Sequence, residues 1–492
     1  MTEPATATEA RPAPLKAPVR SPVKAAYGLG SLVDGVAGAV VGTFLFFYFT
    51  AVLGLSGSMV GAAAAISLVV DAAVDPLLGS WSDNTRSRWG RRIPFMIVGA
   101  PLAAIALGLL FSPPHHLAPL ALFAWLLALS LLLRAAGSTF NVPFIALGAE
   151  ISDDYAERSS VVAWRTVFSI FGALAVSVLG LLVFLSKSRG GQLYAPGYAP
   201  LAWTSAVLML AGGDVCVFGI RRFAAGLPVT AVDPTAMHRR FAGEVVEVFK
   251  NPSFRVLFAT LVLFFVGQGV AATLSVHMNV FVWKINSTQI LVTTVGYLGG
   301  LLVGVPLTPL LSRHFEKRTL VLGGLTVLAL VQGVLTGLRA LHLFTVSGAA
   351  VVLPLTLNVF VGGIGVTFAA ISFASMMADA ADEHDFLFRR RREGLYFAGL
   401  GFAAKAATGL GALIGGIGLD LIRFPRNLAN QGAAAHIAIA PQTLDALAVV
   451  AGPAVALISI IAISLLFLYR IDRRRHEEVV KVLVDRRAAA EG

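Results

Sequence analysis

Long apolar segments alternate with short polar ones along almost the whole chain. Each apolar segment holds roughly 20 residues or more, enough for a helix to cross the hydrocarbon core of a bilayer. The segments are continuous and do not alternate polar with apolar positions, so we expect helices, which satisfy their backbone groups internally. The pattern predicts twelve spans, near residues 26–50, 58–80, 93–112, 118–148, 160–186, 200–219, 254–282, 289–311, 318–338, 343–377, 394–419 and 443–470.

A polar stretch from Arg221 to Asn251 divides these spans into six and six. We therefore predict an all-α membrane protein with two six-helix halves, at 26–220 and 254–470, joined by a central cytoplasmic loop at 221–253. Residues 1–25 are rich in Pro, Ala and Thr and lack the apolar core of a signal peptide, so we expect a disordered cytoplasmic tail. Residues 471–492 are expected to form a basic cytoplasmic tail.

Composition and charge agree with this interpretation. Hydrophobic residues make up 57% of the chain and charged residues 13%, against about 25% charged in a soluble domain. The net charge of +11 would suggest nucleic-acid binding in a soluble protein, but most Lys and Arg residues lie in the two tails and the even-numbered loops. The asymmetry predicts cytoplasmic termini in a plasma (bacterial inner) membrane. The odd-numbered loops hold only Lys187, Arg189, Lys284, Arg339, Arg423 and Arg426.

A faint internal repeat relates the two halves. The stretches DPLLGSWSDNTRSRWGRR, after the second span, and VPLTPLLSRHFEKR, after the eighth, each place a proline (Pro76 and Pro306) ahead of a short basic turn. Matching loops in two six-helix halves fit the parallel repeat of a major-facilitator transporter, in which the substrate site lies between the halves at mid-membrane. The alternative is that any short cytoplasmic loop is basic.

Six ionisable side chains fall inside the predicted spans, where a charge costs roughly 3 kcal/mol or more and is usually functional. Three are acids and three are bases, so they could neutralise one another in a central cavity. Two of the bases come from different halves, so binding between them could be coupled to closure of the halves. The six are Asp34, Asp71, Asp75, Arg134, Arg165 and Lys405.

Two of these acids share one face of the second span. Ser67, Asp71, Asp75 and Gly79 recur every four residues, which is the spacing of one helix face. Carboxylates one turn apart repel each other unless a cation lies between them or one of them holds a proton. A sodium site and a proton-coupled carrier both fit this arrangement. The alternative is that each aspartate pairs with a base.

The fourth span presents a second polar face. Arg134, Ser138 and Asn141 lie at positions i, i+4 and i+7. The hydroxyl and the amide suit either a cation or a polyhydroxylated ligand, and Pro143 could kink the helix. The alternative is that these small polar residues form hydrogen bonds between helices.

At these motifs the sequence resembles the glycoside–pentoside–hexuronide:cation symporter family, typified by melibiose permease, within the major-facilitator fold. YGLGSLVDG resembles the start of the family's first span, and DAAVDPLLGSWSDNTRSRWGRRIPF its signature at the second. FNVPFIALGAEIS resembles the motif of the fourth span, and ADAADEHDFLFRRRREGLYFA the acidic-then-basic loop before the eleventh. The resemblance covers nearly all of the chain after residue 25.

The resemblance implies roles for individual residues. Asp71 and Asp75 match the aspartates that bind the coupling cation in the family, and Ser138 matches a hydroxyl residue of the same site. Arg165 matches an arginine near the sugar, and Lys405 a lysine near the cation site. The family therefore implies cation-coupled sugar transport, with Na⁺ or H⁺ as the coupling ion and Na⁺ able to bind at the two aspartates.

The sequence also departs from the family pattern. Val74 stands where melibiose permease has an asparagine, which removes one amide ligand. The two sugar-binding aspartates of that permease are replaced by Gly35 and Asn141. Asp34 is offset by one residue from the first, and this offset turns a helical side chain by about 100°. A galactoside is therefore in question. Arg134, without a counterpart, could favour an acidic sugar such as a hexuronide or could pair with Asp34.

We expect a symporter that moves a sugar, glycoside or hexuronide by alternating access and that acts as a monomer in the bilayer. We expect neither enzymatic activity, nor a cofactor, nor a nucleic-acid partner. A carrier of the same fold that moves a lysolipid or another amphiphile is the alternative. The resemblance adds Trp164, which precedes Arg165, to the surroundings of the sugar. The expected substrate site comprises Asp34, Arg134, Asn141, Trp164, Arg165 and Lys405.

Charged cytoplasmic loops suggest a gate. Opposite charges on loops from different halves could hold the cytoplasmic side closed in the outward-facing state. The alternative is that they only set the topology and form weak surface pairs, worth about 0–1 kcal/mol each. The predicted gate comprises Asp83, Arg86, Arg88, Arg91 and Arg92 after the second span, and Asp382, Glu383 and Asp385 before the basic run Arg389–Arg392.

Overall fold

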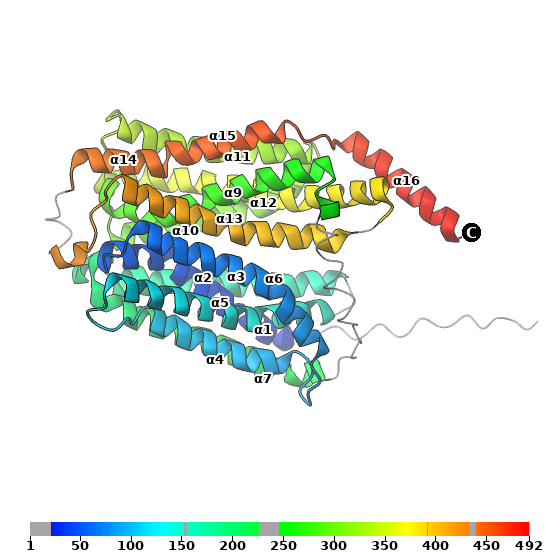
Figure 1. The fold of residues 1–492 in the computed structure, drawn as a ribbon, viewed down its shortest axis with the longest axis horizontal. Helices are drawn as coiled ribbons and strands as arrows, with labels where there is room; N and C mark the ends of the chain where they lie inside the picture. Colours follow the sequence, from blue (N-terminus) through cyan, green and yellow to red (C-terminus); the bar gives the residue numbers. More distant parts are fainter. Residues whose placement is uncertain (1–20, 152–154, 226–245, 391, 432–438, 492) are drawn as a thin grey trace, which may run out of the picture.

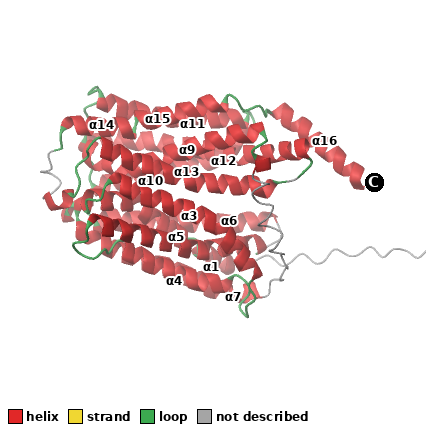
Figure 2. Cartoon of the chain, in the orientation of Figure 1, coloured by secondary structure: helices red, strands yellow, loops and turns green. Residues whose placement is uncertain are grey.

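The computed structural model describes residues 21–151, 155–225, 246–390, 392–431 and 439–491. Within these ranges the secondary structure is helical, with no strand (Figure 2), and twelve helices are long and apolar enough to cross a membrane. The twelve predicted spans are therefore confirmed. Most of the predicted N-terminal tail, residues 226–245 of the predicted central loop and the last residue lie outside the described ranges.

The first half runs from α1 to α7 (Figure 1). Its first span covers Ser21–Val52 and continues beyond α2 through π-helical turns. The helices are α1 (Ser21–Leu29), α2 (Leu32–Val40), α3 (Gly57–Asn84), α4 (Ile93–Leu110), α5 (Pro119–Glu150), α6 (Tyr155–Val178) and α7 (Tyr198–Ala225).

The second half runs from α9 to α15, and α16 follows it. The twelfth span is divided between α14 and α15 at Gly452, because Pro453 has no N–H with which to continue the helical hydrogen bonds. The helices are α9 (Pro252–His277), α10 (Ser287–Ser312), α11 (Lys317–Ala340), α12 (Val352–Phe388), α13 (Glu393–Leu421), α14 (Pro441–Ala451), α15 (Pro453–Leu466) and α16 (Arg473–Glu491).

The two halves meet mainly along α3 and α13. Within the halves, α4 packs on α5 and α7, and α12 packs on α10 and α11. Between the halves, glycines bring the two backbones into contact: a Cβ atom added to Gly57 would lie 2.4 Å from the carbonyl oxygen of Gly416. Small residues permit this close approach, which favours the association of helices in lipid.

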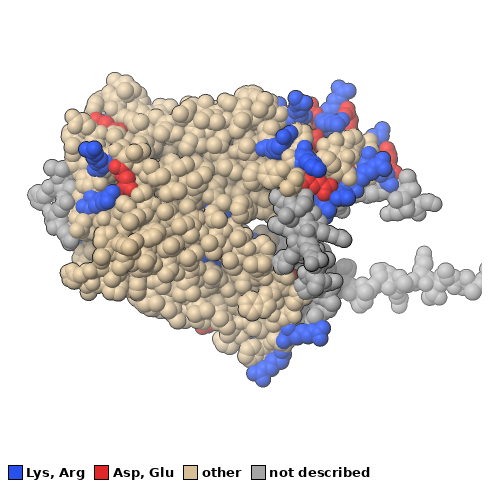
Figure 3. All heavy atoms as spheres, viewed as in Figure 1, with Lys and Arg blue, Asp and Glu red and all other residues tan. Residues whose placement is uncertain are grey.

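The two ends of the bundle differ. The start of α1 and all of α16 lie at one end, here called the termini end, and the opposite end is called the far end (Figure 1). At the far end, Thr50 Oγ1 lies 3.1 Å from His277 Nε2, and the Ser287 hydroxyl donates to the Leu185 carbonyl oxygen at 2.5 Å. Figure 3 shows the surface hollowed between the halves toward the termini end. The protein is therefore closed at the far end and open at the termini end.

Several predicted boundaries are wrong. Residues 21–25, predicted to belong to the disordered tail, begin α1, and residues 221–225, predicted to belong to the central loop, end α7, because polar residues ended the apolar pattern without ending the helix. The apolar pattern predicts that the tenth span ends at residue 377, but α12 continues to Phe388. Asp382, Glu383 and Asp385 therefore lie on the last turns of a helix and not in a loop. An acidic run ends the apolar pattern without ending the helix, because a helix can continue in water. α12 ends at Arg389, whose φ of 56° is left-handed.

Candidate functional site

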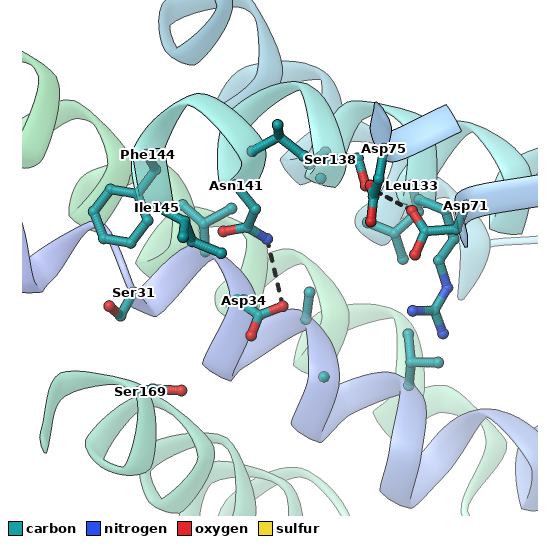
Figure 4. Close-up of a pocket in the computed structure, with 18 of the residues that line it drawn as sticks. Ser31, Asp34, Asp71, Asp75, Leu133, Ser138, Asn141, Phe144, Ile145 and Ser169 are labelled. Atoms are coloured by element: carbon teal, nitrogen blue, oxygen red, sulfur yellow. Dashed lines mark hydrogen bonds between the residues drawn. The ribbon is translucent and has the colours of Figure 1, made fainter. Parts of the chain in front are cut away.

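A cavity of about 610 Å³ lies between the halves, and its wall is formed mainly by α2, α3, α5, α6 and α13. Figure 4 shows the part of the wall that belongs to the first half. Trp164 is the predicted site residue that does not line the cavity; its ring stacks on Phe168 of the same helix, with the centroids 5.8 Å apart. The predicted residues that do line it are Asp34, Asp71, Asp75, Arg134, Ser138, Asn141, Arg165 and Lys405.

Asp71 and Asp75 lie one turn apart on α3 and share a single base. Lys405 Nζ, from α13, donates to Oδ2 of Asp71 at 2.7 Å and to Oδ2 of Asp75 at 2.5 Å. The Ser138 hydroxyl, from α5, donates to Oδ1 of Asp71 at 2.6 Å (Figure 4). The sequence leaves open whether a cation, a proton or two separate bases relieves the repulsion. In the described state the single ammonium group of Lys405 relieves the repulsion between the two carboxylates.

The carboxylate pair still lacks one positive charge. Two carboxylates face one ammonium, and the Asp71 side chain is only 5% exposed. Oδ1 of Asp75 is buried and has no hydrogen-bond partner within the described residues. A buried acceptor without a donor costs free energy. The site therefore favours one further cation or proton.

Asp34 and Gly35 face different directions on α2. Asp34 lines the cavity and accepts a hydrogen bond from the Asn141 amide at 3.4 Å (Figure 4). A Cβ atom added to Gly35 would lie 2.4 Å from the carbonyl oxygen of Ser169 on α6. An acid at position 35 would not fit this packing, whereas the one-residue offset directs the carboxylate of Asp34 into the cavity.

Two guanidinium groups line the same cavity. Arg134, on α5, has no hydrogen bond or ion pair within the described part of the chain, and the charges of Asp71 and Asp34 act on it from beyond ion-pair distance. The direct pair of Arg134 with Asp34 that the sequence left open is therefore not formed in this state. Arg165, on α6, lies beside the hydroxyl of Tyr27.

Three hydroxyl residues of the cavity wall, Ser31, Thr166 and Ser169, are absent from the sequence prediction. Ser31 lies one turn before Asp34, and Ser169 lies one turn after Arg165, so helical spacing from the charged residues would have indicated both. The Ser31 hydroxyl is buried and has no hydrogen-bond partner among the residues described. Such hydroxyl groups can bind a polyhydroxylated ligand.

Two basic residues of the predicted gate, Arg91 and Arg92, form ion pairs within the first half. Arg92 Nη2 donates to Asp83 at 3.3 Å and to Glu150 at 2.8 Å, and Arg91 also contacts Glu150. Burial lowers the pKa of the Arg92 guanidinium, and the charges of these two carboxylates oppose that effect. Arg86 and Arg88 are exposed in the turn between α3 and α4.

The acidic residues of the predicted gate lie on the last turns of α12 in the second half. Asp382 Oδ2 is 3.3 Å from His476 Nε2 of α16, whereas Glu383 is buried and Asp385 is half-buried. These contacts of Asp382, like those of Arg91 and Arg92, stay within one half. The pairing agrees with an open termini end, where residues from the two halves are apart.

The chain matches a family described as "MFS/sugar transport protein" over residues 26–473. It is 27% identical over 397 residues to the inner membrane symporter YicJ of Escherichia coli, which covers 80% of this chain and 81% of that protein. It is 23% identical over 409 residues to the isoprimeverose transporter of Lactiplantibacillus pentosus, which covers 83% and 82% of the two chains.

A third relative is the sodium-dependent lysophosphatidylcholine symporter 1 of the mouse, at 28% identity over 170 residues, which covers 34% of this chain and 32% of that protein. Among solved structures, the xylose transporter XylE of Escherichia coli in an inward open conformation has a TM-score of 0.59 at 13% identity, and the match covers 94% and 99% of the two chains. The structural similarity confirms the predicted fold.

Proposed function

The chain belongs to the MFS/sugar transport protein family, and on that premise we propose that it is a cation-coupled symporter of a sugar, glycoside or hexuronide that works by alternating access. One observation carries the proposal: Lys405 of the second half bridges Asp71 and Asp75 of the first. A relative named as a symporter and another named as an isoprimeverose transporter support the same class. No catalytic step and no cofactor form part of the proposal.

The coupling cation binds at Asp71 and Asp75, with help from the Ser138 hydroxyl. One monovalent cation neutralises the single negative charge left by two carboxylates and one ammonium. Closure of the cavity removes water from these groups, and an uncompensated buried charge costs roughly 3–5 kcal/mol. The cation therefore lowers the free energy of the closed, substrate-loaded state. Transport of the substrate thereby becomes dependent on the cation gradient.

We place H⁺ ahead of Na⁺ as the coupling ion. A sodium ion needs several oxygen ligands, and Val74 stands where the family resemblance leads one to expect an amide oxygen. A proton needs only one carboxylate oxygen, and Oδ1 of Asp75 is buried and without a hydrogen-bond partner within the described residues. Na⁺ is the alternative that the uptake experiment below distinguishes.

The substrate lies between the halves, where Asp34, Asn141 and Arg165 line the cavity with Arg134. The cavity wall holds three acids and three bases, and the coupling cation adds one positive charge. A substrate with one carboxylate restores neutrality, so an acidic sugar such as a hexuronide is favoured. Arg134, which lacks a partner within the described residues, is the group to bind the carboxylate, in the bidentate geometry that guanidinium groups prefer.

Two further residues have indirect roles in this proposal. Lys405 reaches the cavity from the second half, so it can contact the substrate while it stays beside the aspartates. Trp164 lies outside the cavity wall and supports α6 through its stacking on Phe168. A lysolipid substrate has less support, because the relative named for one matches only about a third of each chain.

The termini end faces the cytoplasm in this proposal, because Lys and Arg residues gather there (Figure 3) and the positive-inside rule then applies. The membrane is the inner membrane if the cell is bacterial, and one chain, which contains the whole cavity, acts alone. The described state is then inward-facing. In the outward-facing state the arginines around Arg92 exchange partners with the acids around Asp382 and close the cytoplasmic side.

The experiment is uptake by purified protein in liposomes, with the Na⁺ and pH gradients imposed separately. Paired substrates that differ only at C6, such as methyl glucuronide and methyl glucoside, report the preference for charge. We expect an inward proton gradient at equal Na⁺ concentrations to accelerate uptake of the uronide and to drive its accumulation. Uptake that only equilibrates the substrate under both gradients contradicts coupling and indicates a uniporter.

A further inference from the structure

Asp420, on the last turn of α13, reaches out of its own half and binds the first turn of α3. Its Oδ1 accepts from the backbone N–H of Gly57 at 3.0 Å, and its Oδ2 accepts from the N–H of Ser58 at 2.8 Å. The first N–H groups of a helix have no partner within the helix and carry partial positive charge. Asp420 therefore caps α3 from the other half of the protein, and Arg426 supports its Oδ1 at 2.8 Å.

The same two helices also form the cation site. α3 carries Asp71 and Asp75 and α13 carries Lys405, so this helix pair is joined near its middle by the charged bridge and at the far end by Asp420. Between these two levels the backbones touch: a Cβ atom on Gly61 would lie 2.6 Å from the Ala412 carbonyl oxygen. Separation of the halves at the far end must break the cap as well as this packing.

We infer that Asp420 is a positioning residue for the transport cycle: it holds α3 against α13 while the far end is closed and must release α3 each time that end opens. The other hydrogen bonds described between the halves at the far end join Thr50 with His277, Ser287 with Leu185, and Gln192 with Ser287, and none involves a carboxylate. Asp420 thus supplies a charged contact at this end. The inference goes beyond the proposed function, which concerns the binding site.

The test measures the opening of the far end directly. Spin labels are placed on exposed residues of opposite halves at the far end, through Ser188→Cys and Thr345→Cys, after the buried Cys216 is replaced by Ala. Distances are then measured by double electron–electron resonance in the full chain in lipid nanodiscs. Asp420→Asn keeps the side-chain size but removes the charge and one acceptor oxygen. We expect it to raise the ratio of open to closed far ends roughly threefold to tenfold.

Asp445→Asn is the matched control. Asp445 pairs with His342 at 3.1 Å in the same half, so this variant removes a carboxylate without touching the interface between the halves. Its distance distribution should equal that of the parent. If Asp420→Asn does not yield folded protein, Asp420→Ala serves, because it removes both oxygens that accept from the N–H groups of Gly57 and Ser58.

The distances need neither substrate nor an ion gradient, so failure of the transport proposal would leave this result unaffected. We expect the population of long distances to increase in Asp420→Asn and to stay at the parent level in Asp445→Asn. A distribution in folded Asp420→Asn equal to that of the parent would overturn the inference. Where Asp420→Ala is the variant used, an unchanged distribution would overturn it equally.

Discussion

The ammonium nitrogen of Lys405 lies 2.7 Å from a carboxylate oxygen of Asp71, in a contact that joins two halves of the protein across 334 positions of sequence. Asp75 binds the same ammonium one turn further along α3. Lysine thus occupies the position between two carboxylates where a coupling cation would reduce their repulsion. The ammonium balances only one of the two carboxylate charges, so the proposed coupling cation joins this bridge and does not replace the lysine.

Removal of the bridge should lower the stability of the protein. In Lys405→Gln the two carboxylates face each other without a base, so we expect the apparent free energy of unfolding to fall by about 1–3 kcal/mol at pH 7.5. Thermal unfolding of purified protein measures the loss. The double variant Lys405→Gln with Asp75→Asn removes one charge of each sign and should recover stability at pH 7.5; no recovery would argue against the charge balance.

Ser138→Ala should alter cation binding without abolishing transport, because a carboxylate that loses a hydrogen-bond donor binds a proton more tightly, whereas a sodium site loses a hydroxyl ligand. The hydroxyl donates to Oδ1 of Asp71 at 2.6 Å, and a hydrogen bond to a charged group is worth about 1.5–3 kcal/mol at most. We expect the cation concentration for half-maximal uptake to change roughly threefold to thirtyfold. Thr139→Ala is the control, since that hydroxyl donates within its own helix to the Ala135 carbonyl. Equal effects of the two variants would remove Ser138 from the cation site.

Arg134→Gln should separate acidic from neutral substrates. The unpaired guanidinium is proposed to bind a carboxylate, so its loss should weaken binding of a uronide by roughly tenfold to a hundredfold. Binding of the matched neutral glycoside should change little. Ligand-induced thermal stabilisation of the purified protein compares the two. A uniform loss for both ligands would mean that Arg134 supports the structure of the cavity and does not recognise charge.

Electrical measurements should agree with the proposed transport of one cation with one substrate carboxylate. One cation transported with one monoanionic sugar moves no net charge, so uptake of the acidic sugar should not depend on membrane potential. A potassium diffusion potential set with valinomycin in liposomes provides the test, with the neutral glycoside as the comparison. Uronide uptake that is accelerated by an inside-negative potential would show that more than one cation moves with each substrate.

The sequence predicts the fold well because the bilayer imposes a strong pattern on it. Apolar segments and the distribution of Lys and Arg are sufficient for twelve spans in two halves, and helical spacing places Asp71 with Asp75 and Ser138 with Arg134. The end of α12 is missed, since the acidic residues around Asp382 end the apolar pattern but not the helix.

Contacts between helices of opposite halves could not be predicted from the sequence. The sharing of one lysine by two aspartates, and the cap that Asp420 places on α3, depend on how helices from opposite halves cross, and local spacing carries no information about it. The direction of Asp34 was likewise open, because only the packing of Gly35 on α6 decides which of the two residues faces the cavity.

The most direct test of the central claim is gradient-driven uptake by the Asp71→Asn, Asp75→Asn double variant, compared with passive exchange of substrate across the same liposomes. Without these two carboxylates the proposed coupling site is lost, so we expect accumulation against a concentration gradient to be lost, while exchange can persist. Accumulation that continues undiminished in the double variant would contradict the assignment of the coupling site to Asp71 and Asp75.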